Sequence, residues 1–308
     1  MIKVTSLVKK YGEITAVKGL NFEVKEGEII GFLGPNGAGK TTTLRILTGF
    51  IPATDGKAEI AGYDVFENPL EVKRNIGYLP EFPPVYPDLT VKDYLDFVAG
   101  IKNVPKHKKK PYTDYVVEKC GLANVFNRRI GELSKGYKQR TGIAQAMIHK
   151  PKILFLDEPT SGLDPIQIIE VRNLIKELRQ EHTIMLSTHI LPEVSATCSK
   201  VLIINKGLIV AEDTPENLTE KLKSDNLFEI KIMEEIEKAE NTLSNMEKIK
   251  KINQKENGVF EIETVDNTSI SDIINTLVHS GVKIYSVIPK TATLEEVFLH
   301  LTTKEEVK

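Results

Sequence analysis

A glycine-rich stretch, Gly34-Pro35-Asn36-Gly37-Ala38-Gly39-Lys40-Thr41, has the residue types and the spacing of a phosphate-binding loop. It lies between an apolar run, Ile29 to Leu33, and an amphipathic run, Thr42 to Leu47, where a buried strand is expected to pass into a helix. Glycines let consecutive backbone amides turn toward a polyphosphate, and a helix N-terminus favours the same charge. Lys40 adds a cation for the β- and γ-phosphates, and the Thr41 hydroxyl is a candidate ligand of Mg²⁺.

Two adjacent acids, Asp157 and Glu158, follow the short apolar run 153–156. Ligands bind at the carboxyl ends of strands in open parallel sheets, and neighbouring buried carboxylates are costly unless a metal or a water uses them. We expect Asp157 to hold Mg²⁺, directly or through water, and Glu158 to orient and deprotonate an attacking water. The alternative is a pair of solvated loop acids.

Three further positions carry weaker signals. The expected strand Thr183 to Leu186 runs into Ser187-Thr188-His189, which favours contact between His189 and a γ-phosphate over a structural histidine. Tyr11, in an expected turn, offers an aromatic face to an adenine ring. Ser134 precedes a helical run, and from that segment alone a plain helix cap is the favoured interpretation.

Length and composition limit the possibilities. The 308 residues favour two domains, and the formal net charge of −2 gives no electrostatic signature of nucleic-acid binding. The basic run Lys106 to Lys110 is expected to be a solvated loop. The two cysteines fit a reducing cytosol, and neither a signal peptide nor a membrane-spanning run is expected.

The order of apolar patterns predicts an α/β chain with domains at 1–225 and 226–308. Two or three strands are expected between Ile2 and Lys25, and a helical insert over about 88–150. The second domain follows the ferredoxin-like βαββαβ order, with a last helix starting in a capping box, Thr293 to Glu296. It carries no catalytic constellation, so an accessory, dimer-contacting or regulatory role is favoured over a small-ligand sensor.

Taken together, these motifs in this order resemble the ATP-binding subunit of ABC transporters over roughly residues 1–224. The resemblance implies a P-loop NTPase fold with a mixed sheet core, an antiparallel β subdomain and a helical insert. It implies ATP and Mg²⁺ as cofactors and Lys40, Glu158 and His189 as catalytic residues. The residues implied to bind the nucleotide of the same chain are Tyr11, Gly34, Asn36, Gly37, Ala38, Gly39, Lys40, Thr41 and Thr42.

The resemblance also implies a head-to-tail dimer with two ATP molecules between its halves. Ser134 and Gly136 would bind the γ-phosphate of the nucleotide held by the opposite subunit, and Asp164 would lie across that interface. Two intact half-sites in one chain permit a homodimer, although a related second subunit stays open. The chain would sit in the cytoplasm, on the inner face of the membrane, held there by a transmembrane permease.

Two positions depart from the commonest family pattern. Glu81 stands where glutamine usually faces the metal and the attacking water, which leaves the manner of metal binding open; Thr41, Glu81 and Asp157 are the expected metal ligands. The signature segment has Lys135 and Tyr137 in place of glycine and glutamine. Both departures resemble those of exporters for antibiotics, polysaccharides or lipids and of gliding-motility systems.

The expected function is therefore ATP hydrolysis that powers translocation, with export favoured over import. The stretch Phe82-Pro83-Pro84-Val85-Tyr86, within a surface running to Tyr94, is the expected docking segment for the permease, a packed loop being the alternative. A soluble ABC ATPase acting on ribosomes or DNA is the rival interpretation. A regulatory protein that holds ATP without turnover is a third, which the presence of Glu158 and His189 disfavours.

Overall fold

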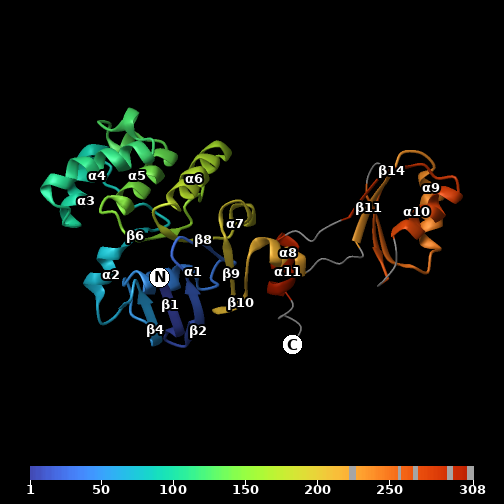
Figure 1. The fold of residues 1–308 in the computed structure, drawn as a ribbon, viewed down its shortest axis with the longest axis horizontal. Helices are drawn as coiled ribbons and strands as arrows, with labels where there is room; N and C mark the ends of the chain where they lie inside the picture. The colour runs from blue at the N-terminus through green and yellow to red at the C-terminus, as the bar shows by residue number, and fades with distance from the viewer. Residues whose placement is uncertain (222–226, 256–257, 266–269, 290–293, 304–308) are drawn as a thin grey trace. The chain divides into compact units, whose positions relative to one another are not determined.

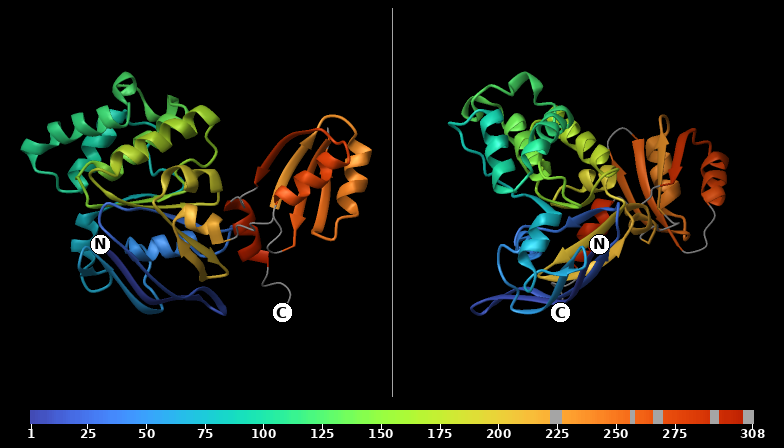
Figure 2. Two further views of the ribbon diagram at one scale, coloured as in Figure 1. Left: turned by 45° about the vertical axis from the view of Figure 1, so that its right-hand side comes forward. Right: turned by 60° about the vertical axis from the view of Figure 1, so that its left-hand side comes forward.

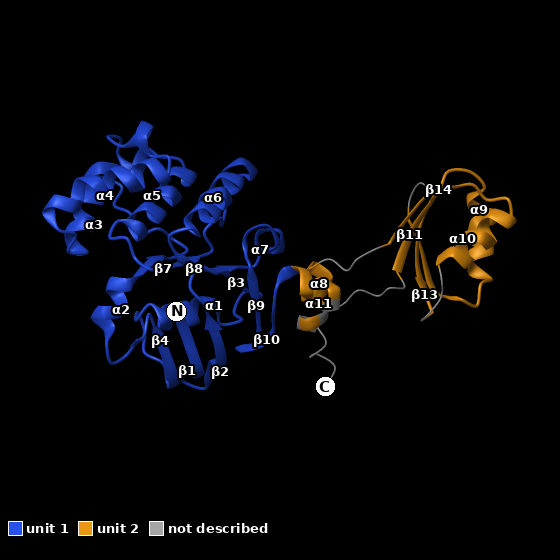
Figure 3. Ribbon diagram, in the orientation of Figure 1, with its two compact units in different colours: residues 1–215 blue, residues 216–308 orange. Residues whose placement is uncertain are grey.

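The computed structural model describes residues 1–221, 227–255, 258–265, 270–289 and 294–303. The chain divides into two compact units, Met1–Pro215 and Glu216–Lys308 (Figures 1 and 3). The boundary expected between 225 and 226 lies outside the described residues. No helix among the described residues is long and apolar enough to cross a membrane.

A six-stranded sheet forms the centre of the first unit. Its order is β10-β9-β3-β8-β7-β6, and neighbouring strands are parallel except for the antiparallel hairpin β9–β10. Every residue of β3 and β7 is buried, as expected for parallel strands covered on both faces. The strands are β3 (Ile29–Leu33), β6 (Ile76–Leu79), β7 (Ile153–Asp157), β8 (Thr183–Thr188), β9 (Lys200–Asn205) and β10 (Leu208–Asp213).

A second, antiparallel sheet has the order β2-β1-β4-β5. The region before the phosphate loop, where two or three strands were expected, forms two long ones that pair from Ile2 with Val24 to Tyr11 with Ile14. One hydrophobic cluster contains residues of both sheets and of the helix after the phosphate loop. The strands are β1 (Ile2–Tyr11), β2 (Ile14–Val24), β4 (Asp55–Ile60) and β5 (Tyr63–Asp64).

The helices of the first unit fall into two groups. The helical insert is confirmed and forms one end of this unit in Figure 1. It consists of α3 (Val91–Ile101), α4 (Lys106–Lys119) and α5 (Lys135–Met147), and the short 3₁₀ turns Ala123–Val125 and Ile130–Glu132 lie between α4 and α5. The helices directly connected to the sheets are α1 (Lys40–Leu47), α2 (Pro69–Asn75), α6 (Pro165–Leu178) and α7 (Leu191–Thr197).

The expectation of a loop at the basic run Lys106 to Lys110 was wrong. These residues are the first turns of α4, largely exposed, and the amides of Lys108 and Lys109 donate to the Pro105 carbonyl oxygen at 2.8 and 3.1 Å. Pro105 is the N-cap of α4, and the fixed φ of proline favours the start of a helix. The run of positive charges by itself gave no sign of this helix. The lysines are solvated, as expected, but helical.

The second unit has the βαββαβ order that the sequence predicts. Its sheet is antiparallel with the order β12-β13-β11-β14, and both helices lie on one face of it, over a shared apolar core (Figure 2). The elements are β11 (Leu227–Ile232), α9 (Ile236–Ser244), β12 (Ile249–Lys255), β13 (Val259–Thr264), α10 (Ile270–His279) and β14 (Ile284–Pro289). Two further helices belong to the ends of this unit, α8 (Pro215–Lys221) and α11 (Leu294–Thr303); Thr293 of the expected capping box lies outside the described residues.

Candidate functional site

The phosphate loop joins β3 to α1 and is held in shape by its glycines. Gly39 is the N-cap of α1 at φ +109°, a conformation that favours glycine. A Cβ on Gly34 would come within 2.4 Å of the Ile204 carbonyl oxygen, so only glycine fits beside β9. The buried Lys40 ammonium donates to the Gly34 carbonyl oxygen at 2.7 Å, which places its charge inside the curve of the loop.

Strand register brings the two polar strand ends to this loop. Asp157 pairs with Ser187 across β7 and β8, and Thr188 pairs with Leu33, the last residue before the loop. Because these strands are parallel, their carboxyl ends lie along one edge of the sheet. The acids after β7 and the histidine after β8 therefore meet at the start of α1.

Asp157 is 1% exposed and lies under the loop. Its Oδ1 accepts hydrogen bonds from the Thr41 hydroxyl, at 3.2 Å, and from the Ser187 hydroxyl. Its buried Oδ2 has no hydrogen-bond partner among the described residues. Burial and the nearby charge of Asp157 raise the pKa of Tyr78, on the neighbouring strand β6, to about 12.

Glu158 is held between two groups that could contact a phosphate. Its Oε1 lies 3.5 Å from the Lys40 ammonium, and its Oε2 lies 2.9 Å from Nδ1 of His189. Its backbone N–H donates to Ser187, and its φ of +49° is unusual for a residue with a side chain. The side chain of Glu158 is thus held by both backbone conformation and polar contacts, with His189 half exposed beside it.

These groups line a common cavity of about 340 Å³. The structure brings together in it most of the same-chain residues expected from the sequence, Glu81 included. Gly34 packs against Ile204 and Ala38, Ala38 belongs to the hydrophobic core, and Asp157 is buried next to Thr41, so these three do not line the cavity. The lining residues are Ala16, Pro35, Asn36, Gly37, Gly39, Lys40, Thr41, Thr42, Glu81, Glu158, Ser161 and His189.

Besides Gly34, Ala38 and Asp157, four more of the expected residues do not line this cavity. Tyr11 is half exposed at the end of β1, with the Lys9 ammonium 5.2 Å from its ring centroid. Ser134 caps α5 by accepting from the Tyr137 N–H at 3.4 Å, and Asp164 caps α6 by accepting from the Gln167 N–H at 2.9 Å.

Gly136, the remaining member of that set, faces the first turn of α6. A Cβ on this residue would come within 2.6 Å of the Gln167 side chain. Within one chain, the signature segment therefore lies beside the start of α6, and neither Ser134 nor Gly136 lines the phosphate-loop cavity.

Comparison with known proteins decides the family. Residues 17–161 match the family model described as "ABC transporter". The chain is also 34% identical over 299 residues to the uncharacterised ABC transporter ATP-binding protein YxlF of Bacillus subtilis, covering 97% of this chain and 98% of that one. The chain belongs to the ATP-binding proteins of ABC transporters. The resemblance noted in the sequence is confirmed.

Further comparisons cover the two parts of the chain separately. Residues 214–302 match the "ATP-binding protein DrrA1-3-like, C-terminal domain". The bacitracin transport ATP-binding protein BcrA of Bacillus licheniformis is 46% identical over 214 residues, 69% of each chain. The ATP-binding cassette MJ0796, whose dimer was solved with ADP and Pi, has a TM-score of 0.63 and 25% identity over 70% of this chain and 98% of that one. The protein is an ABC-type ATPase that binds ATP.

Two polar residues of this ABC ATPase escaped the sequence analysis. Ser187 donates to Asp157, and its signal was the polar triplet that ends β8. Glu193 of α7 is buried and accepts hydrogen bonds from Thr160 and Thr188. Its only sequence signal was a glutamate in the first turn after His189, which is ordinary at a helix start.

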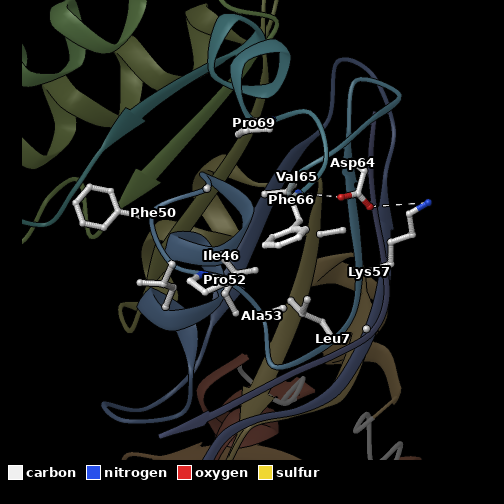
Figure 4. A pocket seen from close by; sticks show the side chains of 14 residues that line it. Leu7, Ile46, Phe50, Pro52, Ala53, Lys57, Asp64, Val65, Phe66 and Pro69 are labelled. Carbon is white, nitrogen blue, oxygen red and sulfur yellow. Dashed lines mark hydrogen bonds and ion pairs between the residues drawn. The ribbon is translucent and has the colours of Figure 1, made fainter.

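A second hollow of the ABC ATPase, about 350 Å³ in volume, lies between α1 and the antiparallel sheet (Figure 4). Its walls are mainly apolar and include Phe66 and Pro52, and the ion pair of Lys57 and Asp64, 3.9 Å apart, lies on one side. It contains none of the motif residues, so it is not part of the nucleotide site.

Proposed function

We propose that this chain hydrolyses ATP to power export through a separate transmembrane permease. The observation that carries the proposal is the contact series Lys40–Glu158–His189 in the phosphate-loop cavity, next to the Thr41–Asp157 hydrogen bond. Relatives named for bacitracin and lantibiotic transport support export as the direction.

The chemistry assigned to the site follows from its charges. Lys40 and the loop amides bind the β- and γ-phosphates of ATP, and Tyr11 stacks on the adenine. Glu158 orients the attacking water and takes its proton, while His189 holds the γ-phosphate in place. The hydrogen bond between these two residues fixes the base next to the phosphate contact.

The residues also fit a magnesium ion. The unpartnered Oδ2 of Asp157 is a buried anionic oxygen, and oxygen atoms are the ligands that Mg²⁺ prefers. Thr41, Asp157 and Glu81 would hold the ion, with Asp157 acting directly or through water. Bound there, Mg²⁺ would neutralise charge on the phosphate oxygens.

The active unit we infer is a head-to-tail dimer, a homodimer in its simplest form. Ser134 and Gly136 bind the γ-phosphate held by the other subunit, with Asp164 across the interface. Ser134 and Asp164 are exposed and do not line the chain's own cavity, which supports this arrangement, because a second copy can reach them. ATP then joins the two halves, and loss of the γ-phosphate releases them.

We place the permease on the segment Phe82 to Tyr86. Phe82 is 79% exposed. Tyr86 contacts the rings of Tyr94 and Phe97 edge-on, and these contacts hold the end of the segment against α3. The Tyr94 hydroxyl donates to the Pro84 carbonyl oxygen at 3.0 Å. Exposed aromatic side chains on a fixed loop are typical anchors at interfaces. The permease would hold the chain on the cytoplasmic face of the membrane.

The test is recovery of the partner from native membranes. Tagged Glu158→Gln protein with ATP is used to capture complexes after detergent extraction, and the bound proteins are identified by mass spectrometry. We expect one stoichiometric multispanning protein. Recovery of ribosomes or DNA-binding proteins, or of no membrane protein, would overturn the transport proposal in favour of a soluble ATPase.

Two matched aromatic variants of that bait test the docking segment. Phe82→Ala should recover less permease, whereas Phe66→Ala, at the hollow of Figure 4 and 81% exposed, should recover as much as the parent. Loss of permease with Phe66→Ala but not with Phe82→Ala would indicate that the permease docks at the hollow beside α1.

Glu81 gives a prediction about the metal. Replacing Glu81 by glutamine removes one anionic oxygen from the cavity, so the Mg²⁺ concentration for half-maximal ATPase activity should rise several-fold. Binding of ATP without Mg²⁺ should not weaken, because one negative charge near the γ-phosphate is lost. ATPase rates over a Mg²⁺ titration measure the first effect, and unchanged metal dependence would remove Glu81 from the metal site.

A further inference from the structure

Glu193 is a charged residue in the interior that the proposed chemistry does not use. It lies in the first turn of α7 and is 3% exposed. Burying a carboxylate is costly unless its oxygens find partners, so its contacts indicate what it stabilises.

The two carboxylate oxygens bind different segments, the turn after β7 and the last residue of β8. Oε1 accepts from the Thr160 hydroxyl, and Oε2 accepts from the Thr188 hydroxyl at 2.8 Å. The Arg172 guanidinium lies 3.9 Å from Oε1 on the α6 side. The Thr188 hydroxyl also accepts from the Ile190 N–H at 3.0 Å, so its direction is fixed on both sides.

The chain positions of these threonines connect Glu193 to the site. Thr160 is in the turn that starts at Glu158, whose carbonyl oxygen accepts from the Ser161 N–H at 3.1 Å. Thr188 directly precedes His189. One buried carboxylate therefore joins the segment that carries the base to the segment that carries the phosphate contact, and neither Glu193 nor its two threonines line the cavity.

We propose that Glu193 is a positioning residue that fixes Glu158 relative to His189, with Thr160 and Thr188 as its two attachments. The register of β7 and β8 and the hydrogen bonds of the Glu158 N–H to Ser187 align the two strand ends. Beyond the strand ends, the hydrogen bonds of Glu193 to Thr160 and Thr188 add a further link between the segments that form the 2.9 Å contact between Glu158 and His189. This inference rests on the proposed ATPase site. It assigns Glu193 no contact with ATP.

The test separates turnover from binding. Glu193→Ala should lower kcat about 10- to 100-fold, the size expected for misplaced catalytic groups, while the KM for ATP stays within about twofold. Glu193→Gln should give an intermediate kcat, because its amide can still accept from one hydroxyl and donate to the other. Steady-state ATPase kinetics and thermal unfolding are measured on the full chain for every variant.

The threonines provide an isosteric version of the same test. Thr160→Val and Thr188→Val should each lower kcat, Thr160→Ser and Thr188→Ser should restore it, and the double valine variant should lose less than the product of the single losses. Thr48→Val is the matched control, since this buried hydroxyl donates only to carbonyl oxygens of α1. It should lower the melting temperature without changing kcat. If Glu193→Ala does not fold, the threonine variants test the positioning role of Glu193.

Three results would overturn the inference. The first is an unchanged kcat in the valine variants. The second is serine variants that are no more active than the valine variants. The third is a rise in the KM for ATP that accounts for the whole loss of ATPase activity in Glu193→Ala. If wild-type ATPase activity survives Glu158→Gln, the proposed site itself fails. If Glu158→Gln abolishes turnover but Glu193→Ala and both valine variants retain it, only the role of Glu193 fails.

Discussion

Replacing Glu158 by glutamine is expected to lower kcat for ATP hydrolysis by about 10²- to 10⁴-fold, the range of a lost general base. The amide keeps the shape of the side chain and can still accept from His189, so the loops should keep their places. It cannot take a proton from water. It also removes the negative charge 3.5 Å from the Lys40 ammonium, which leaves that cation free for phosphate.

The measurement is steady-state phosphate release alongside size-exclusion chromatography with ATP and Mg²⁺. We expect the variant to bind ATP as well as the parent and to accumulate as an ATP-dependent dimer, because closure no longer ends in hydrolysis. Glu177→Gln, an exposed change on α6, is the control and should behave as wild type. Turnover at the wild-type rate in Glu158→Gln would exclude Glu158 as the base.

Replacing Lys40 by alanine is the substitution with the second large expected effect, and it should weaken the binding of ATP. The ammonium lies inside the phosphate loop, where it donates to the Gly34 and Pro35 carbonyl oxygens at 2.7 and 3.3 Å. A hydrogen bond between charged groups contributes about 1.5–3 kcal/mol, so ATP affinity should fall roughly 10- to 100-fold. ATP-dependent dimerisation should be lost with it at millimolar ATP.

Equilibrium binding of a fluorescent ATP analogue and thermal unfolding together separate this effect from misfolding. The melting temperature of Lys40→Ala should not fall steeply, because Glu158 keeps its hydrogen bond to His189. Lys176→Ala, in the last turn of α6, controls for the loss of one positive charge. Equal ATP affinity in Lys40→Ala and wild type would show that the loop does not bind the polyphosphate through this residue.

Much of the fold was determined by patterns local in the chain. The βαββαβ order of the second unit was readable because its strands and helices differ in apolar period, and the structure adds the strand order β12-β13-β11-β14. The helix α2 (Pro69–Asn75) begins at a proline, whose fixed φ suits the first helical position. By contrast, the first turns of α4 were predicted to be a loop, because the run Lys106 to Lys110 is basic and has no apolar residues at helical spacing.

The sequence by itself determined the phosphate loop, because its glycines, Lys40 and Thr41 are adjacent and their chemistry needs only a strand and a helix around them. It also identified Asp157, Glu158 and His189 as candidates, since each follows an apolar strand. Only the tertiary structure decided how they meet. Register across three strands puts Asp157 beside Ser187 and Thr188 beside Leu33, and Glu193 bonds to two loops at once. Such pairings join distant segments through packing, and no local pattern of residues encodes them.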